Sequence, residues 1–564
     1  MPLTKNFDSS CERLNDLIDK ERKKVLAALN QSKSPYKDLI SIIRQFDLFY
    51  ISVQSGGQPD KKQANKILEF YRYGWSDSLA YYLPKVSSLD SPPVFPSNIQ
   101  AQSWADSVLG VSGKIATAAR QLDIAKAGLI DIEQTAQNTF ITKFKHIIKE
   151  KEHYDRESFE FVKGLALTIL KERHEAHLAN FEDIRKLLPD IIQNPLGKFI
   201  GYKATEEIDN YYAEAGYFHV LKEQGYEEFG EEDIFGGISY KHYLDCVQDT
   251  SSGTLLHIDC CHELLNKNPS VNPYDIFTYN WYLDKKIEGY ASHFGLPLET
   301  ASQILSCFIL TEENLPFYQN LRGSLPPPFI QTGKNQYARS IYGSLHGAID
   351  FLKRELKRRY EKDYFLAVNK REKRFRDNLY VFFPGERFIR VDKEIILKYD
   401  GLHTDIDAVV YDKKTKSLGL FQLKWQDMFY TSTTERYSRI SNLFPKATEW
   451  IDKMENWINN FTQKDVIKKL TLDKNSVNEI GQVFIFVIAR NHVHFTGVEP
   501  DGRAAWATMN QIPFSLSRIK TSFDDPIREL HLKLKMDSPE ERVKREGYPM
   551  LQNYKIELDS FSIE

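Results

Sequence analysis

Apolar residues recur at three- and four-residue spacing, with charged residues between them, over most of residues 1–320. The clearest examples are "CERLNDLIDKERKKVLAALN" (11–30) and "RESFEFVKGLALTILKERHEAHLANFEDIRKLLPDII" (156–192). This spacing is typical of amphipathic helices, and no run in this part keeps a period of two for long. We therefore predict a large all-α N-terminal region over residues 1–325, with a joint between two subdomains at the Pro- and Ser-rich segment 87–98.

The pattern changes near residue 325. "NLRGSLPPPFIQTGKNQ" (320–336) combines a proline triplet with Gly and Asn, so we predict a linker and a basic helix over residues 326–364. An α/β domain over residues 365–520 and a C-terminal extension over residues 521–564 are predicted to follow. The elements predicted for the domain are a helix at 369–383, strands at 387–399, 405–411 and 418–425, a helix at 433–461 and a strand at 482–489.

Polar residues interrupt two of these strands at matching places. Side chains alternate across a strand, so Asp405 and Asp407 should share one face, with Ile406, Ala408 and Val410 on the other. By the same rule Gln422 and Lys424 share one face of the next strand. If the two strands pair through the short turn "DKKTKS", these four polar side chains converge.

Such a group suits a divalent metal ion and a phosphate. Asp407 offers a hard oxygen ligand of the kind that Mg²⁺ or Mn²⁺ prefers, and the amide oxygen of Gln422 offers a second, uncharged one. Lys424 would hold the attacking water or stabilise the charge that develops on the phosphate. The chemistry that this set of residues predicts is phosphodiester hydrolysis.

The pattern Asp407, then Gln422-Leu423-Lys424, resembles the restriction-endonuclease-like (PD-(D/E)XK) nucleases, in particular the Mrr-like branch in which Gln replaces the second acid. The resemblance covers roughly residues 365–495. It implies an αβββαβ core with a mixed sheet and a Mg²⁺- or Mn²⁺-dependent endonuclease, with double-stranded DNA as the expected substrate. Family members often carry a glutamate on the preceding helix, and Glu372 matches it, with Phe375 and Leu379 on the packing face. Gln422 leaves one negative charge fewer, which Glu372 would restore as a third ligand.

Simpler interpretations of these residues stay open. Asp407 and Lys424 also suit a solvated sheet edge or a cross-strand ion pair, and Gln422 suits a satisfied buried amide. Asp405 either supports the metal ligands from behind or simply begins a strand. Basic residues cluster at 352–376, where a surface that contacts phosphates is useful to a nuclease, although a solvated helix has the same composition. The candidate phosphate contacts are Lys373, Arg374, Arg436 and Arg439.

Composition narrows the picture further. The net charge of -3 excludes a globally basic nucleic-acid-binding protein, and the sequence shows neither a signal peptide nor a membrane-spanning run, so we expect a cytoplasmic protein without a membrane partner. Five cysteines fit a reducing compartment better than a disulfide framework. The stretch 242–265, rich in His and Cys, lacks clean zinc-site spacing, and the acidic stretch 227–237 lacks calcium-loop spacing. No GK[ST] phosphate loop and no Gly-x-Ser-x-Gly elbow occurs.

The sequence thus predicts a metal-dependent DNA endonuclease with a role in bacterial defence or DNA processing. The helical region is expected to act as a sensor, a target reader or an oligomerisation platform, with a second copy or an activating protein as partner. The alternative is a catalytically inactive scaffold or nucleic-acid-binding protein of the same fold. An RNA nuclease would use the same chemistry.

Overall fold

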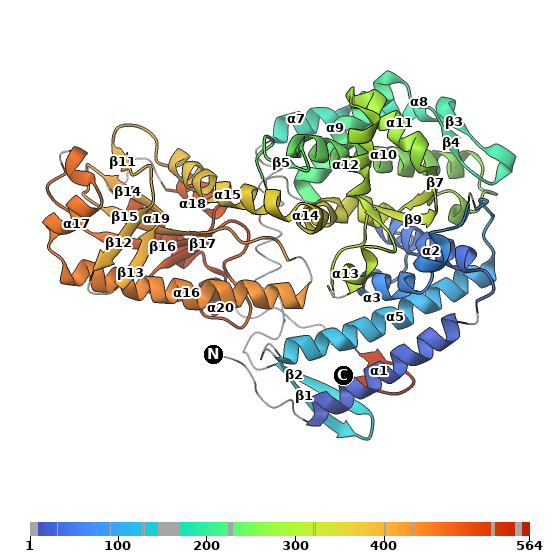
Figure 1. The fold of residues 1–564 in the computed structure, drawn as a ribbon, viewed down its shortest axis with the longest axis horizontal. Coiled ribbons are helices and arrows are strands. Elements are labelled where there is room, and N and C mark those ends of the chain that lie inside the picture. The colour runs from blue at the N-terminus through green and yellow to red at the C-terminus, as the bar shows by residue number, and fades with distance from the viewer. Residues whose placement is uncertain are drawn as a thin grey trace.

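The computed structural model describes residues 9–546 and 555–564, except 31, 91, 127, 129, 145–169, 224–228, 320, 322, 400–401, 430–431, 476 and 520–524. Part of the predicted helical stretch 156–192 therefore lies outside the described residues. Figure 1 shows two lobes, with α14 (Ala348–Arg359) and α15 (Glu361–Val381) running between them. Within the described part of the chain, every helix is too short or too polar to span a bilayer.

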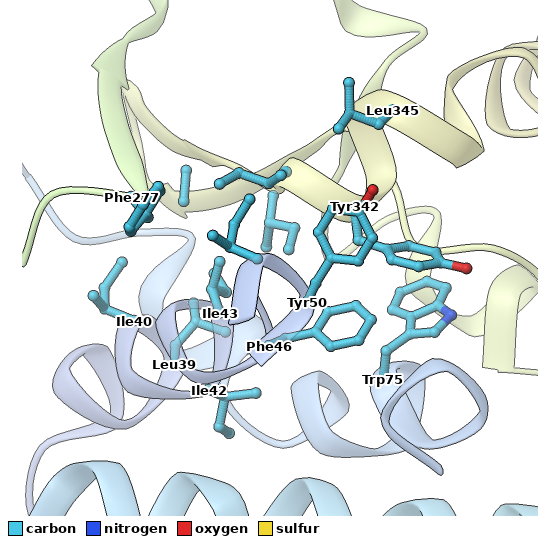
Figure 2. Close-up of a cluster of buried hydrophobic side chains, with 14 of the residues drawn as sticks. Leu39, Ile40, Ile42, Ile43, Phe46, Tyr50, Trp75, Phe277, Tyr342 and Leu345 are labelled. Carbon is cyan, nitrogen blue, oxygen red and sulfur yellow. The ribbon is translucent and has the colours of Figure 1, made fainter. Parts of the chain in front are cut away.

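The N-terminal lobe is mainly helical, as predicted. Figure 2 shows its largest core, where Phe46 and Tyr50 of α2 meet Trp75 of α3 and Tyr342, which is almost 300 residues later in the sequence than α2. The segment 87–98, predicted as a joint between subdomains, connects α4 to α5, and both helices contribute to this one core. The helices are α1 (Ser9–Leu29), α2 (Pro35–Gln54), α3 (Lys61–Ala80), α4 (Leu83–Val86), α5 (Ile99–Lys126), α7 (Lys171–Ala179), α8 (Phe181–Ile191), α9 (Glu206–Glu223), α10 (Tyr240–Lys267), α11 (Leu283–Phe294), α12 (Leu298–Ser306) and α13 (Leu315–Gln319).

This lobe is not all-α, which corrects the prediction. A four-stranded sheet has the order β7-β10-β9-β8, and a second has the order β1-β2-β19-β18. The strands are two to seven residues long, β10 is buried along its whole length, and in β1 the alternation covers only Ile130 to Glu133, so the sequence pattern was too short to identify them. Their bounds are β1 (Ile130–Ala136), β2 (Thr139–Phe144), β3 (Ile192–Gln193), β4 (Gly201–Tyr202), β5 (Ile234–Phe235), β6 (Ile238–Ser239), β7 (Tyr279–Tyr282), β8 (Ile309–Leu310), β9 (Phe329–Gly333) and β10 (Gln336–Arg339).

The predicted linker also differs from what the structure contains. Residues 323–330 are buried, and β9 and β10 lie within or directly after the proline-rich run. Gly343 packs against this run so closely that a Cβ there would lie 1.9 Å from the carbonyl oxygen of Pro327. The prolines therefore form an extended segment inside the N-terminal core, because extended backbone is what a proline run favours whether it is exposed or buried.

The C-terminal lobe contains a mixed five-stranded sheet of order β11-β14-β15-β16-β17. β11 and β15 are antiparallel to β14, whereas β15, β16 and β17 are mutually parallel. The long helix α16 connects β15 to β16, as a parallel pair requires. The elements are β11 (Phe388–Arg390), β12 (Ile395–Tyr399), β13 (Leu402–Ile406), β14 (Ala408–Asp412), β15 (Leu418–Lys424), α16 (Thr433–Asn460), α17 (Gln463–Lys469), β16 (Val483–Ala489), β17 (Ala505–Thr508), α18 (Gln511–Ser517), α19 (Pro526–Met536) and α20 (Pro539–Glu546).

Helices cover both faces of this sheet. On one face Phe375 and Leu379 of α15 pack with residues of α18, α19 and the sheet, so the packing face predicted for α15 is confirmed. On the other face Trp450 of α16 and Val466 of α17 pack against the remaining strand residues. The result is a three-layer arrangement in which the sheet is buried between helices.

The predicted C-terminal extension belongs to both lobes. α19 packs on β16 and β17 as part of the C-terminal core. The last strands, β18 (Ile556–Glu557) and β19 (Ser562–Ile563), return to the N-terminal lobe, where β19 pairs with β2. Their side chains pack with those of α1 and α5, so the two ends of the described chain share one small core.

Candidate metal and phosphate site

The chain bends at Asp407, between β13 and β14. β13 pairs only with β12 in a two-stranded sheet, while β14 belongs to the five-stranded sheet. Ile406 consequently packs on the α16 side, and Ala408 packs on the α15 side. The prediction that Ile406 and Ala408 share a face of one strand is wrong, because the bend resets the alternation that a continuous strand would keep.

The bend brings three carboxylates together. Oxygen atoms of Glu394, Asp405 and Asp407 all lie within 4.8 Å of one another, and they form the one such group of metal-binding side chains among the described residues. Asp405 is fixed by its backbone, because the indole nitrogen of Trp450 donates to its carbonyl oxygen at 2.5 Å. The carboxylate of Asp405 belongs to this group of three, so Asp405 is itself a candidate ligand and does more than begin a strand.

Glu394 was not identified from the sequence. The run 387–399 resembled one strand, but the structure divides it into β11 and β12, with Glu394 directly before β12. The β12–β13 hairpin pairs Ile395 with Ile406 and Ile396 with Asp405, which carries Glu394 to the bend. The signal in the sequence was the charged triplet Asp392-Lys393-Glu394 between the apolar residues Val391 and Ile395, a composition that favours a break between strands.

Two residues of β15 donate hydrogen bonds to the carboxylate of Asp407. Its Oδ2 accepts hydrogen bonds from the backbone N–H of Leu423 at 2.6 Å and from the Gln422 amide nitrogen at 3.2 Å. Gln422 is only 3% exposed, and in this orientation its NH₂ group, rather than the predicted oxygen ligand, faces Asp407. Burial, with a smaller contribution from the charge of Asp405, raises the pKa of Asp407 to about 6, although the charge of Lys424 opposes the rise.

Lys424 lies at the end of β15, close enough for its charge to act on Asp407. The side chain is half-buried, and its ammonium forms no ion pair or hydrogen bond with any residue that the structure describes. Phe421 and Leu423 pack on the opposite, α15 side of the sheet, as the alternation in β15 predicts. Lys424 is therefore a cation that remains available beside the carboxylates.

Glu372, the predicted ligand from α15, is exposed and lies outside the group of three carboxylates. It is nevertheless close to it, because its charge contributes to raising the pKa of Glu394. The main causes of that shift are the partial burial of Glu394 and a hydrogen bond with Asp405. Glu372 thus lies near the site but outside the group of three carboxylates.

The four predicted phosphate contacts are all held by other protein groups. Arg374 forms an ion pair with Asp233 at 3.1 Å, and Lys373 forms one with Asp377 of its own helix at 2.6 Å. Arg436 is 3% exposed and donates to the carbonyl oxygen of Thr496 at 3.0 Å. Arg439 donates to the carbonyl oxygen of Asp427 at 3.1 Å.

Two further stretches singled out in the sequence have structural roles. The His- and Cys-rich stretch lies in helix α10, where the buried His257 donates from Nε2 to the carbonyl oxygen of Phe277. None of its described His and Cys residues belongs to a group that could hold a metal ion. In the acidic stretch 227–237, Asp233 is buried and bridges Lys370 and Arg374 of α15. Residues 227–228 lie outside the described part.

Comparison with protein-family models, with curated proteins and with solved structures finds no match for this chain.

Proposed function

We propose that the C-terminal lobe is a restriction-endonuclease-like nuclease that hydrolyses phosphodiester bonds in DNA with Mg²⁺ or Mn²⁺. The observation that carries this proposal is the convergence of Glu394, Asp405 and Asp407 beside the unpaired Lys424. The order of the core elements, α15, β11, β14, β15, α16 and β16, agrees with the αβββαβ pattern that the resemblance implies.

The donor set fits a hard divalent cation. Three carboxylates within 4.8 Å of one another repel each other when ionised, and the raised pKa values of Asp407 and Glu394 express that cost together with burial. A cation with oxygen preference removes the repulsion, and such an ion supplies Lewis-acid polarisation of the phosphate and activation of water. Glu394, Asp405 and Asp407 are the residues that would hold it.

The remaining residues of the site have separate tasks in this proposal. Lys424 orients the attacking water or stabilises the negative charge that grows on the phosphate oxygens, because among the described residues its ammonium has no partner to compete. Gln422 holds the Asp407 carboxylate through its amide N–H, so it positions a ligand instead of serving as one. The acid missing at position 422 is supplied by Glu394 from the hairpin.

DNA is the proposed substrate, and bacterial defence or DNA processing the proposed role, by the same resemblance. A single site of this kind cuts one strand, so a second copy of the chain is the partner that double-strand cleavage would require. The N-terminal lobe is proposed to read the target or to receive the activating signal.

A cleavage assay tests the proposal. Purified wild type and Lys424→Ala are incubated with supercoiled plasmid, linear duplex DNA and single-stranded RNA in Mg²⁺, Mn²⁺ or EDTA. We expect metal-dependent DNA cleavage that falls by about 10²-fold or more in Lys424→Ala, as when one group that stabilises transition-state charge is removed. Lys416→Ala is the matched control, because its ammonium lies in an exposed pair with Glu479 away from the carboxylates.

The outcomes separate the alternatives. Cleavage of RNA alone would reassign the substrate and keep the chemistry. Equal activity of wild type and Lys424→Ala would show that the cleavage comes from elsewhere. If wild type cuts nothing but shows metal-dependent thermal stabilisation, the inactive scaffold becomes the better description.

A further inference from the structure

Arg376 is a cation at the site that sequence reasoning did not single out. It lies on α15 one helical turn after Glu372, so both side chains project from the same side of the helix. Its Nη1 donates to the backbone carbonyl oxygen of Asp407 at 3.1 Å. The guanidinium is thereby anchored at the bend that carries the central carboxylate.

Among the described residues, the other two nitrogens of this guanidinium, Nε and Nη2, have no hydrogen-bond partner. Its Nε is buried without a hydrogen bond, and the side chain forms no ion pair with any residue in the described part of the chain. This is notable because Glu372, Glu394 and Asp405 all lie in the same neighbourhood. The neighbouring arginines Arg371 and Arg374, by contrast, are paired with Asp427 and Asp233.

A half-buried guanidinium with unsatisfied donors is costly, and a ligand with acceptor oxygens would offset that cost. A guanidinium has five donors in a planar fork that matches two oxygens of a phosphate. Nη1 is held by the carbonyl oxygen of Asp407, so Nη2, which forms no hydrogen bond with any residue that the structure describes, is the donor left for a phosphate oxygen. The four cations predicted from sequence cannot take this role without breaking the contacts that hold them.

We propose that Arg376 binds a phosphate of the nucleic-acid backbone next to the bond that is cleaved. This inference rests on the proposed nuclease function and adds a residue that binds the substrate. It assigns the contact to α15, one turn from Glu372, and places it apart from Arg436 and Arg439 of α16.

DNA binding tests the assignment independently of turnover. A short labelled duplex is titrated in Mg²⁺ on the Lys424→Ala background, which keeps the DNA intact, over a series of salt concentrations. Arg376→Gln retains an N–H donor for the Asp407 carbonyl but has no charge. We expect it to bind about 10-fold more weakly or worse, with the slope of log K against log salt reduced by roughly 0.9.

Lys373→Gln is the matched control, because it removes the same charge three residues earlier from a side chain paired with Asp377. We expect its affinity and salt slope to stay close to those of the parent. An equal effect of both substitutions would show a general charge effect and overturn the assignment, as would unchanged binding by Arg376→Gln.

A second variant distinguishes a loss of folding from a loss of DNA binding. If Arg376→Gln does not fold, Arg376→Lys retains the charge without the planar fork, and weaker binding at an unchanged salt slope supports the assignment, whereas parental binding overturns it. Wild-type cleavage together with normal binding by Arg376→Gln would overturn this inference alone. A wild type that neither binds nor cuts DNA would overturn the proposed function as well.

Discussion

At the scale of single residues, Asp407 combines opposing requirements. Its carboxylate is held by Leu423 and Gln422 in a largely buried position, where the charged form is disfavoured. Asp405 and Glu394 add repulsion at close range. A carboxylate whose charged form costs stability is suited to binding a cation, which agrees with the proposed metal site.

This cost predicts a pH-dependent stability change in Asp407→Asn. The folded pKa of about 6 lies above the unfolded value of about 3.9, so the contribution of wild-type Asp407 to stability is full below about pH 4 and is lost as pH rises through about 6. In EDTA at pH 8, Asp407→Asn should therefore have a free energy of unfolding higher than that of wild type by at most roughly 3 kcal/mol, and a correspondingly higher melting temperature. The gain should shrink at pH 5 in thermal unfolding.

Asp412→Asn is the opposite control. The ion pair with Arg387 contributes to holding the pKa of Asp412 below its ordinary value despite burial, so loss of that charge should destabilise the protein at pH 8. A melting temperature for Asp407→Asn below that of wild type at pH 8 would contradict the cost in stability assigned to the buried, ionised Asp407 carboxylate.

At the scale of elements, the β12–β13 hairpin is the structure that completes the site. It lies outside the five-stranded sheet, yet it carries Glu394 and Asp405 to Asp407. The helix α15 approaches from the other direction with Glu372 and Arg376. The hairpin thus supplies two of the three clustered carboxylates, while α15 supplies groups at the margin.

This division predicts different effects of two matched substitutions. Glu394→Gln should weaken Mn²⁺ binding by about 10- to 100-fold, because it removes a member of the carboxylate group. Glu372→Gln should weaken it less, because that carboxylate is exposed and outside the group. Isothermal titration with Mn²⁺ measures both. The reverse ranking would show that α15, as the resemblance implies, provides the ligand.

At the scale of the whole molecule, buried charges join the two lobes. Arg354 of α14 pairs with Asp350 at 3.0 Å and with Glu435 at the start of α16 at 2.7 Å. Nearby, Arg371 of α15 pairs with Asp427, three residues after Lys424. The junction therefore contacts the chain segment that leads out of the site, which is a physical route by which the N-terminal lobe can influence it.

Arg354→Ala should be severely destabilising. It leaves Asp350, which is 1% exposed, without its partner, and breaking a buried pair in this way costs about 3–5 kcal/mol. Urea unfolding measures the change. The half-buried pair of Lys533 and Asp537 at the C-terminal end of α19 offers a control, since Lys533→Ala should cost at most about 1 kcal/mol. A similarly small loss in Arg354→Ala would show that the junction does not depend on these charges.

Much of the architecture was determined by local sequence. The helical spacing of the first half and the β-rich runs of the second predicted a helical lobe and an α/β lobe, and both are confirmed. The alternation in β15 correctly placed Phe421 and Leu423 opposite Gln422. These features depend on residues a few positions apart, and the periods of helices and strands record them directly.

Only the tertiary structure decided the composition of the site. The bend at Asp407 is held by the backbone of Leu423, Glu394 arrives through a hairpin, and the predicted phosphate contacts are taken by partners as distant in sequence as Asp233. The proline-rich segment likewise became core once other elements covered it. Such choices depend on which distant groups pair, and the local alternation of apolar and polar residues contains no record of those pairings.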